Sequence, residues 1–192
     1  MNRLDLVVGP NGAGKTTFVE LTLAPLLRDS VFVNADEIAR QRWPRDPESH
    51  AYDAARIAAD TRFALVERGA SFIAETVFSH PSKLELVAAA KAAGYTVVLH
   101  VLMIPEDLAV ERVLHRVAAG GHAVPPDKIR ERHRRLWSVV ADAVPRCDGV
   151  TVYDGSGSRG PRIVAQISGG DVIGSPSWPD WAPRLLTARW AG

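Results

Sequence analysis

Residues 9–16 have the spacing that points most directly to chemistry, because they match the pattern G-x-x-x-x-G-K-[ST]. In such a loop successive backbone N–H groups point inward at a phosphate, and the helix that follows adds its positive dipole end. Lys15 has the reach to contact the β- and γ-phosphates, and the Thr16 hydroxyl can bind Mg²⁺. The pattern predicts a nucleoside triphosphate site. Its residues are Gly9, Pro10, Asn11, Gly12, Ala13, Gly14, Lys15, Thr16 and Thr17.

Two carboxylates that follow predicted strands could act on a second substrate. Asp36 could take a proton from a hydroxyl that attacks the γ-phosphate, or orient Mg²⁺ through water. Its alternative role is the N-cap of a short helix over residues 37–42. Glu75 could hold a substrate hydroxyl or a metal-bound water, or it could be an exposed strand end, while Thr76 and Ser79 are further candidates for positioning the substrate.

Basic side chains concentrate in residues 112–135, a segment that also contains glycines and prolines typical of a mobile connection. Arg112 and Arg116 share one face of a predicted helix, and closing such a lid would bring positive charge onto the transferring phosphate, which can be worth ~10³–10⁵ in rate. The alternative is a solvated basic face that pairs with nearby acids. Further candidates in this segment are His122, as a phosphate contact, and Arg132, which flanks the core-facing side of the next helix.

The elements that must position these residues alternate between strand and helix. We predict strands at residues 4–8, 31–34, 71–75, 96–103 and 150–153, with a weaker sixth at 163–167, and helices at 15–27, 48–68, 81–93, 106–119 and 127–143. This order predicts an α/β fold with a mostly parallel sheet of five to six strands, helices on both faces and a small helical lid. Ligands bind such sheets at the carboxyl ends of the strands, where the candidate residues converge.

Composition narrows the class of protein further. The 192 residues are enough for one domain, which we expect to span 1–192 with a lid at about 112–135 and a tail at about 155–192. Cys147 is the single cysteine, which excludes an internal disulfide and fits a cytoplasmic location. A net charge of +1 gives no reason to expect that the protein binds nucleic acid. The sequence contains no run of about 18 apolar residues, so we expect no membrane span. Strand 96–103 ends without a carboxylate, which argues against a motor-type ATPase.

The chain resembles the zeta-toxin family of P-loop kinases over about residues 4–157, through motifs at 9–17, 34–39, 72–76 with Ser79, 111–113, 116–125, 129–132 and 153–154. The resemblance implies an ATP- and Mg²⁺-dependent kinase that phosphorylates a sugar hydroxyl of a nucleotide sugar such as UDP-N-acetylglucosamine, and it implies an antitoxin protein as a partner. It also implies that Asp36 is the general base, Glu75 binds the substrate hydroxyl and Arg112 binds the γ-phosphate. Arg56 is carried over as a candidate on the substrate side.

Two departures from the family pattern leave the acceptor open. His122 stands near a position where known sugar-nucleotide kinases carry a second lid arginine, and Gly155 replaces the usual asparagine after Tyr-Asp. Arg116 could supply the missing charge. Two other functions remain: a polynucleotide 5′-hydroxyl kinase, which would need a nucleic-acid groove in the arginine-rich segment, and a regulatory ATP-binding protein with a protein partner.

Overall fold

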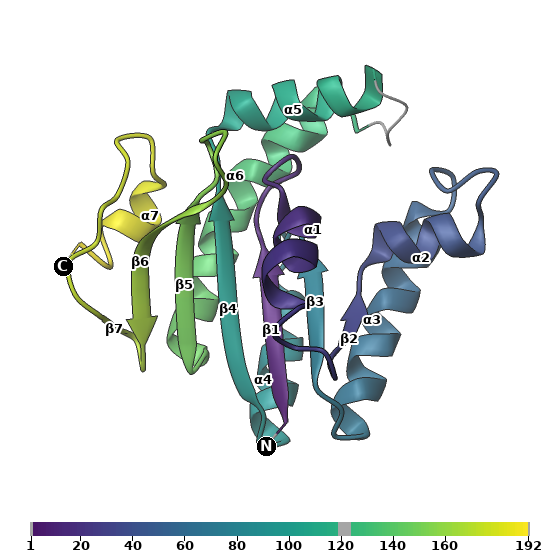
Figure 1. The fold of residues 1–192 in the computed structure, drawn as a ribbon, viewed down its shortest axis with the longest axis horizontal. Coiled ribbons are helices and arrows are strands. Elements are labelled where there is room, and N and C mark those ends of the chain that lie inside the picture. Colours follow the sequence, from purple (N-terminus) through teal and green to yellow (C-terminus); the bar gives the residue numbers. More distant parts are fainter. Residues whose placement is uncertain (1, 119–123, 192) are drawn as a thin grey trace.

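The computed structural model describes residues 2–118 and 124–191. Its centre is a seven-stranded sheet in the order β2-β3-β1-β4-β5-β6-β7, drawn in Figure 1. The first five strands in this order pair in parallel, and β6 and β7 are antiparallel additions at one edge. The strands are β1 (Arg3–Val8), β2 (Val31–Val33), β3 (Phe72–Thr76), β4 (Thr96–Met103), β5 (Gly149–Asp154), β6 (Arg162–Ser168) and β7 (Asp171–Val172).

The predicted mostly parallel α/β fold is confirmed, with one strand more than expected. The weak sixth strand is present as β6, and the two-residue β7 extends it. A strand of two residues carries no alternation that a sequence pattern could detect. Within the parallel part, Val8 of β1 lies level with Thr76 of β3 and Val101 of β4, so the carboxyl ends of these strands meet at one edge.

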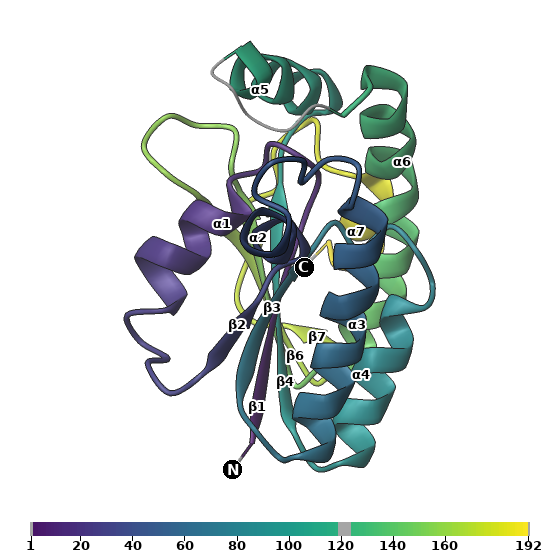
Figure 2. The same cartoon turned by 90° about the vertical axis from the view of Figure 1, so that its right-hand side faces the viewer.

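The helices are α1 (Lys15–Phe18), α2 (Ala35–Arg42), α3 (Ala51–Glu67), α4 (Lys83–Ala92), α5 (Glu106–Ala118), α6 (Pro126–Ala143) and α7 (Arg184–Thr187), with two short turns, η1 (Val19–Leu23) and η2 (Val144–Arg146). Figure 2 shows α3, α4 and α6 on one face of the sheet and α1 on the other. Helix α5 lies across the carboxyl ends of the strands, as Figures 1 and 2 both show.

Two helix predictions need correction. The expected helix at 15–27 is α-helical only to Phe18 and continues as the π-helical turn η1. Helix α2 was foreseen only as an alternative over residues 37–42, and it begins earlier, at Ala35. This helix buries one residue only, Ala39, so it lacks the apolar stripe that identifies a surface helix in a sequence.

The apolar residues of the sheet form a core on each side. One cluster joins β1, β3, β4 and β5 to α3, α4 and α6, and a smaller one joins the opposite face to α1 and α5. The tail belongs to the larger cluster, because Trp190 is 4% exposed and Trp178 and Trp181 pack against it. These tryptophans of the tail therefore cover apolar surface. None of the described helices is long and apolar enough to cross a membrane.

Candidate active site

The loop between β1 and α1 has the backbone that its glycines predict. Gly9 has φ +152°, and a Cβ there would collide with the carbonyl oxygen of Leu102, so no larger residue fits. Gly14 has φ +80° and immediately precedes α1. The Nζ of Lys15 donates to the carbonyl oxygen of Pro10 at 3.0 Å and is buried beneath the loop. The loop is therefore held in a curled form around its own lysine.

Burial lowers the pKa of Lys15, while the negative charges of Glu75 and Asp36 act in the opposite direction. A buried ammonium group is stabilised by any anion placed beside it, because the surrounding protein screens charge less than water does. The loop thus favours the binding of a phosphate at Lys15.

Glu75 connects the loop to the ends of two strands. The Thr16 hydroxyl donates to the Glu75 carboxylate at 2.9 and 3.1 Å, and Asn34 Nδ2 donates to the same group at 2.6 Å. Burial raises the pKa of Glu75, although Lys15 and these two hydrogen bonds oppose the shift. The alternative of an exposed strand end is wrong, because Glu75 is 9% exposed. The oxygens of Thr16 and Glu75 suit Mg²⁺, which takes a few protein oxygens together with waters and substrate phosphates.

Asp36 is not the N-cap of its helix. That role belongs to Asn34, whose Oδ1 accepts from the backbone N–H groups of Asp36 at 2.7 Å and Glu37 at 3.3 Å. The carboxylate of Asp36 is exposed, and it makes no hydrogen bond to any described side chain or backbone group. Its charge reaches both Lys15 and Glu75, because it raises the pKa of each. The Asp36 carboxylate is therefore unpaired among the described residues and lines the same cavity as the phosphate loop.

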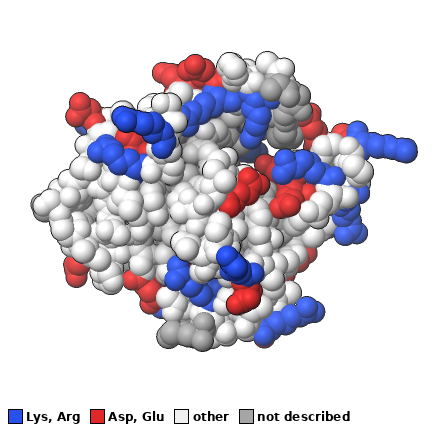
Figure 3. All heavy atoms as spheres, in the orientation of Figure 1, with Lys and Arg blue, Asp and Glu red and all other residues white. Residues whose placement is uncertain are grey.

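One cavity of about 820 Å³ brings these groups together at the carboxyl ends of the strands. Among its lining residues, eight are lysine or arginine and three are acidic. Figure 3 shows blue side chains gathered around a hollow that contains red ones. A cavity with such an excess of positive charge suits a polyanionic ligand. The charged lining residues are Lys15, Arg40, Arg62, Lys83, Arg112, Arg116, Lys128, Arg132, Asp36, Glu48 and Glu75.

Arg112 lies between this cavity and a smaller one. Its guanidinium donates to the carbonyl oxygens of Gly155 at 2.9 Å, Ser156 at 3.2 Å and Gly12 at 3.4 Å. The smaller cavity, about 260 Å³, is bounded by α1, Arg112 and the loop that follows β5. It is next to the phosphate loop and its lining includes Phe18 and Pro161, so it offers an apolar place for a nucleobase. In this structure Arg112 fastens that loop to the phosphate loop.

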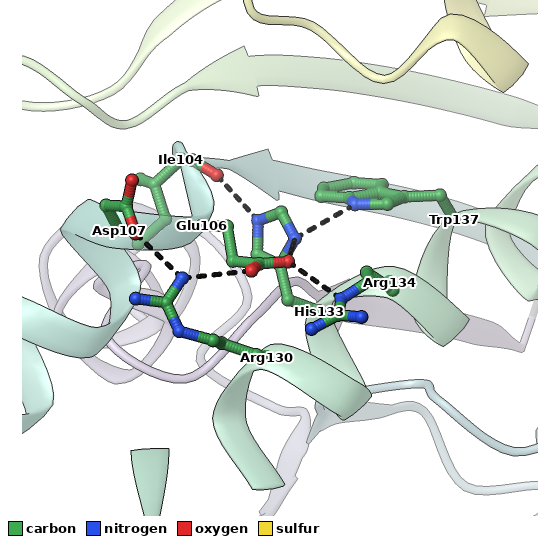
Figure 4. Close-up of polar contacts among 7 residues, drawn as sticks. All are labelled: Ile104, Glu106, Asp107, Arg130, His133, Arg134 and Trp137. Carbon is green, nitrogen blue, oxygen red and sulfur yellow. Dashed lines mark hydrogen bonds and ion pairs between the residues drawn. The ribbon is translucent and has the colours of Figure 1, made fainter. Parts of the chain in front are cut away.

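Two acids at the start of α5 pair with arginines of α6 and not with Arg112 or Arg116. Glu106 pairs with Arg130 at 3.0 Å and with Arg134 at 3.3 Å, and Asp107 pairs with Arg130 at 2.7 Å, as Figure 4 shows. Arg116 and Arg132 line the large cavity and make no ion pair or hydrogen bond with another described residue. Arg130 and Arg134 thus join α6 to α5, whereas Arg116 and Arg132 face the cavity.

His133 completes the junction of α5 and α6 (Figure 4). Its Nε2 lies 2.9 Å from the carbonyl oxygen of Ile104, so Nε2 carries the proton, and its Nδ1 accepts from Trp137 Nε1 at 3.4 Å. Each polar atom of this 9%-exposed imidazole therefore has a partner, as a buried group requires. The contacts fix α6 against the end of β4.

Of the remaining predicted site residues, Thr76 and Ser79 line the large cavity and Arg56 does not. Arg56 is exposed and pairs with Asp53 at 3.7 Å. Ala55 of the same helix does line the cavity, and the next residue on a helix is turned by about 100° away from it. His122 lies outside the described residues.

Sequence reasoning missed three cavity cations, Arg40, Arg62 and Lys83, which in the sequence look like ordinary helix-surface residues.

The segment that follows Glu75 is held in an unusual backbone conformation. Phe78 has φ +66° although it is not glycine, and its ring is buried. Non-glycine residues in this region are strained by about 1–3 kcal/mol and cluster at functional sites. The turn exposes Ser79 and His80 to the cavity before α4 begins.

A parallel sheet with a phosphate loop after β1, a helix across the strand ends and a cationic cavity defines a P-loop kinase fold. Comparison with known families agrees, since the model of the family described as "Zeta toxin" matches residues 2–159. The chain belongs to this zeta toxin family of P-loop kinases.

The chain is 28% identical over 135 residues to an uncharacterised protein of Haemophilus influenzae, covering 69% of this chain and 93% of that protein. A chain of the AvrRxo1-ORF1:AvrRxo1-ORF2 complex with sulphate ions superposes with a TM-score of 0.68 at 17% identity, over 90% of this chain and 60% of that one. A chain of the PezAT toxin-antitoxin system of Streptococcus pneumoniae gives a TM-score of 0.65 at 15% identity, over 86% and 72%. At these identities the two structures show a shared fold.

Proposed function

We propose that the protein is a kinase that transfers the γ-phosphate of ATP to a hydroxyl of a small acceptor, and that the acceptor is a nucleotide sugar. The observation that carries the proposal is the large cavity, where Lys15 and Thr16 of the phosphate loop face Asp36 and Glu75 across one space. A site for nucleotide binding alone has no use for a free carboxylate beside the γ-phosphate position. Phosphoryl transfer to a hydroxyl does require a base there.

The donor half consists of the phosphate loop and the smaller cavity. The loop amides and Lys15 hold the β- and γ-phosphates, and the adenine occupies the space between Phe18 and the loop after β5. Mg²⁺, bound at Thr16, would neutralise charge that develops on the phosphate oxygens. ATP as the donor is supported by the AvrRxo1 complex, of which a structure with ATP has a TM-score of 0.66 to this chain.

The acceptor half consists of Asp36, Glu75, Thr76 and Ser79. The acceptor hydroxyl gives its proton to Asp36 as its oxygen bonds to the γ-phosphorus. The bond from the γ-phosphorus to the β–γ bridging oxygen breaks, and ADP leaves with that oxygen. Glu75 orients the hydroxyl, and Arg116 supplies positive charge to the transferring group from α5.

The nucleotide sugar is proposed because the sequence resemblance to zeta-toxin kinases implies that acceptor and because the cavity that Glu75 lines carries an excess of positive charge. A protein partner that covers the cavity belongs to the same proposal, since the PezAT relative comes from a toxin-antitoxin system.

The test is incubation with ATP, Mg²⁺ and a panel of UDP-sugars, followed by mass spectrometry, with a 5′-hydroxyl oligonucleotide and unphosphorylated sugars in parallel. The proposal predicts a mass gain of one phosphate on at least one UDP-sugar. A gain on the oligonucleotide alone would favour the polynucleotide kinase. Tight ATP binding with no product from any compound would favour the regulatory protein.

A further inference from the structure

Two cationic side chains that belong neither to the phosphate loop nor to the lid line the large cavity. Arg62 comes from α3, and Lys83 is the first residue of α4. Both line the cavity together with Ser79 and His80 of the connecting segment. Neither residue was singled out by its sequence, and the transfer step described above does not use them.

Arg62 is 4% exposed, yet its guanidinium is incompletely bonded. One terminal nitrogen donates to the backbone carbonyl oxygen of Glu75 at 2.9 Å. Its Nε is buried and has no partner in the described part of the chain. An unpaired buried donor is costly, and such atoms are rare unless a ligand or water completes them.

Lys83 lies near Arg62 and has no acceptor either. Its half-buried side chain makes no hydrogen bond or ion pair with any described residue. Burial lowers the pKa of Lys83, and the positive charge of Arg62 lowers it further. The negative charge that acts on Arg62 is that of Glu75. The carboxylate oxygens of Glu75 already accept hydrogen bonds from Thr16 and Asn34. Two like charges are thus held together without an anion between them.

We propose that Arg62 and Lys83 form a second anion subsite, which binds a phosphate group that the acceptor itself carries. The inference rests on the proposed kinase function, because it assigns this part of the cavity to the acceptor. A phosphate has oxygens enough to accept from Arg62 Nε and from the Lys83 ammonium at once, and charge-assisted bonds of this kind are the strong ones. The subsite would hold the acceptor by its phosphate while Glu75 and Asp36, nearer the phosphate loop, contact its hydroxyl.

The subsite can be tested without knowing the acceptor, by titrating inorganic phosphate calorimetrically into protein saturated with Mg²⁺ and a non-hydrolysable ATP analogue. The expected result is a phosphate site in the wild type that Lys83→Gln weakens about 10- to 100-fold, with unchanged affinity for the analogue. Lys91→Gln is the matched control, because Lys91 is in the last turn of the same helix and pairs with Asp148 outside the cavity. Phosphate affinity equal in wild type and Lys83→Gln, or no phosphate binding to the saturated wild type, would overturn the subsite.

Steady-state kinetics separate this inference from the proposed function. With a phosphorylated acceptor, Lys83→Gln should raise the acceptor KM about tenfold or more and leave the KM for ATP unchanged. If unphosphorylated acceptors react as well as phosphorylated ones and the variant behaves as the wild type, the kinase stands and the subsite falls. If phosphate binds as described but no compound of any class is phosphorylated, the subsite stands and the kinase falls.

Discussion

The hydroxyl of Thr16 in the phosphate loop donates a hydrogen bond to the buried carboxylate of Glu75, 2.9 Å away. The two residues are 59 positions apart in the sequence, and the parallel pairing of β1 with β3 brings them together. This bond joins the phosphate loop to the half of the site that we propose for the acceptor. A Mg²⁺ ion bound through a lone pair of the Thr16 oxygen would leave the hydroxyl hydrogen free to keep its bond to Glu75.

Glu75 makes the stability of the unliganded protein depend on pH. Burial raises the pKa of Glu75 above the ordinary 4.5. Between 4.5 and that raised value, the folded protein keeps a proton on Glu75 that the unfolded chain has released. Its contribution is therefore fully present below about pH 4.5 and is lost as the pH rises through the raised value. We expect the unfolding free energy of the wild type to fall relative to Glu75→Gln across this window. Urea unfolding of both proteins at several pH values checks this, and parallel curves would contradict it.

Lys15→Ala should lower kcat/KM by at least about 10²–10³, because it removes a charge preorganised to oppose that of the phosphates. Since burial lowers the pKa of Lys15, bound triphosphate should raise that pKa again, so ATP binding at alkaline pH should take up a proton in the wild type and not in the variant. Calorimetry in buffers of different ionisation enthalpy measures this uptake. An unchanged turnover and ATP affinity in Lys15→Ala would contradict the assignment of Lys15 to the phosphate-binding site.

Arg112 and Arg116, one helical turn apart on α5, should behave differently when each is changed to glutamine. Arg112→Gln removes the hydrogen bonds that the guanidinium donates to three backbone carbonyls, so we expect a loss of about 1–3 kcal/mol in unfolding free energy as well as weaker ATP binding. Arg116→Gln should stay within about 0.5 kcal/mol of the wild type and lose activity only. Urea unfolding and steady-state kinetics on both variants separate the two roles. Equal loss of stability in both would contradict the distinction.

His133→Phe should destabilise the protein by about 1–3 kcal/mol, because the Ile104 carbonyl and the Trp137 indole N–H lose their partner in a buried place. Arg135→Gln serves as the control, since it breaks only an exposed pair with Glu131 and should change stability by about 1 kcal/mol or less. If the two variants unfold at the same urea concentration, the junction of α5 and α6 does not depend on this imidazole.

Features that one continuous stretch of sequence determines could be predicted. Features that form only when distant segments pack together could not. The phosphate loop is one uninterrupted motif between an apolar strand and a helix, so its residues determine its backbone. Strand β7 and helix α2 are short or poorly patterned and depend on neighbours for their stability. Asn34 caps α2 through residues next to it, but its bond to Glu75 joins positions 41 apart, and that second role has no signal in the local sequence.

The cavity cations show the same limit. The family resemblance favours Arg56 as a residue of the substrate site and gives no weight to Arg62. Arg62 nevertheless lies seven residues after Ala55, on the same face of the helix. The helix pattern could have grouped Ala55 with Arg62, but only the packing of α3 beside β3 shows that this face meets the cavity. The carbonyl contacts of Arg112 come from two separate loops and left no sequence signal.

The central claim, transfer of the γ-phosphate to a hydroxyl with Asp36 as the base, is tested most directly with γ-labelled ATP and a metabolite extract. Three proteins are compared: wild type, Asp36→Asn, and Glu37→Gln, which changes the neighbouring carboxylate that pairs with Gln41. Wild type and Glu37→Gln should move the label into an acid-stable small molecule at similar rates. Asp36→Asn should do so about 10²–10⁴-fold more slowly while binding ATP normally. Equal transfer by Asp36→Asn, or release of labelled inorganic phosphate alone by the wild type, would contradict the account.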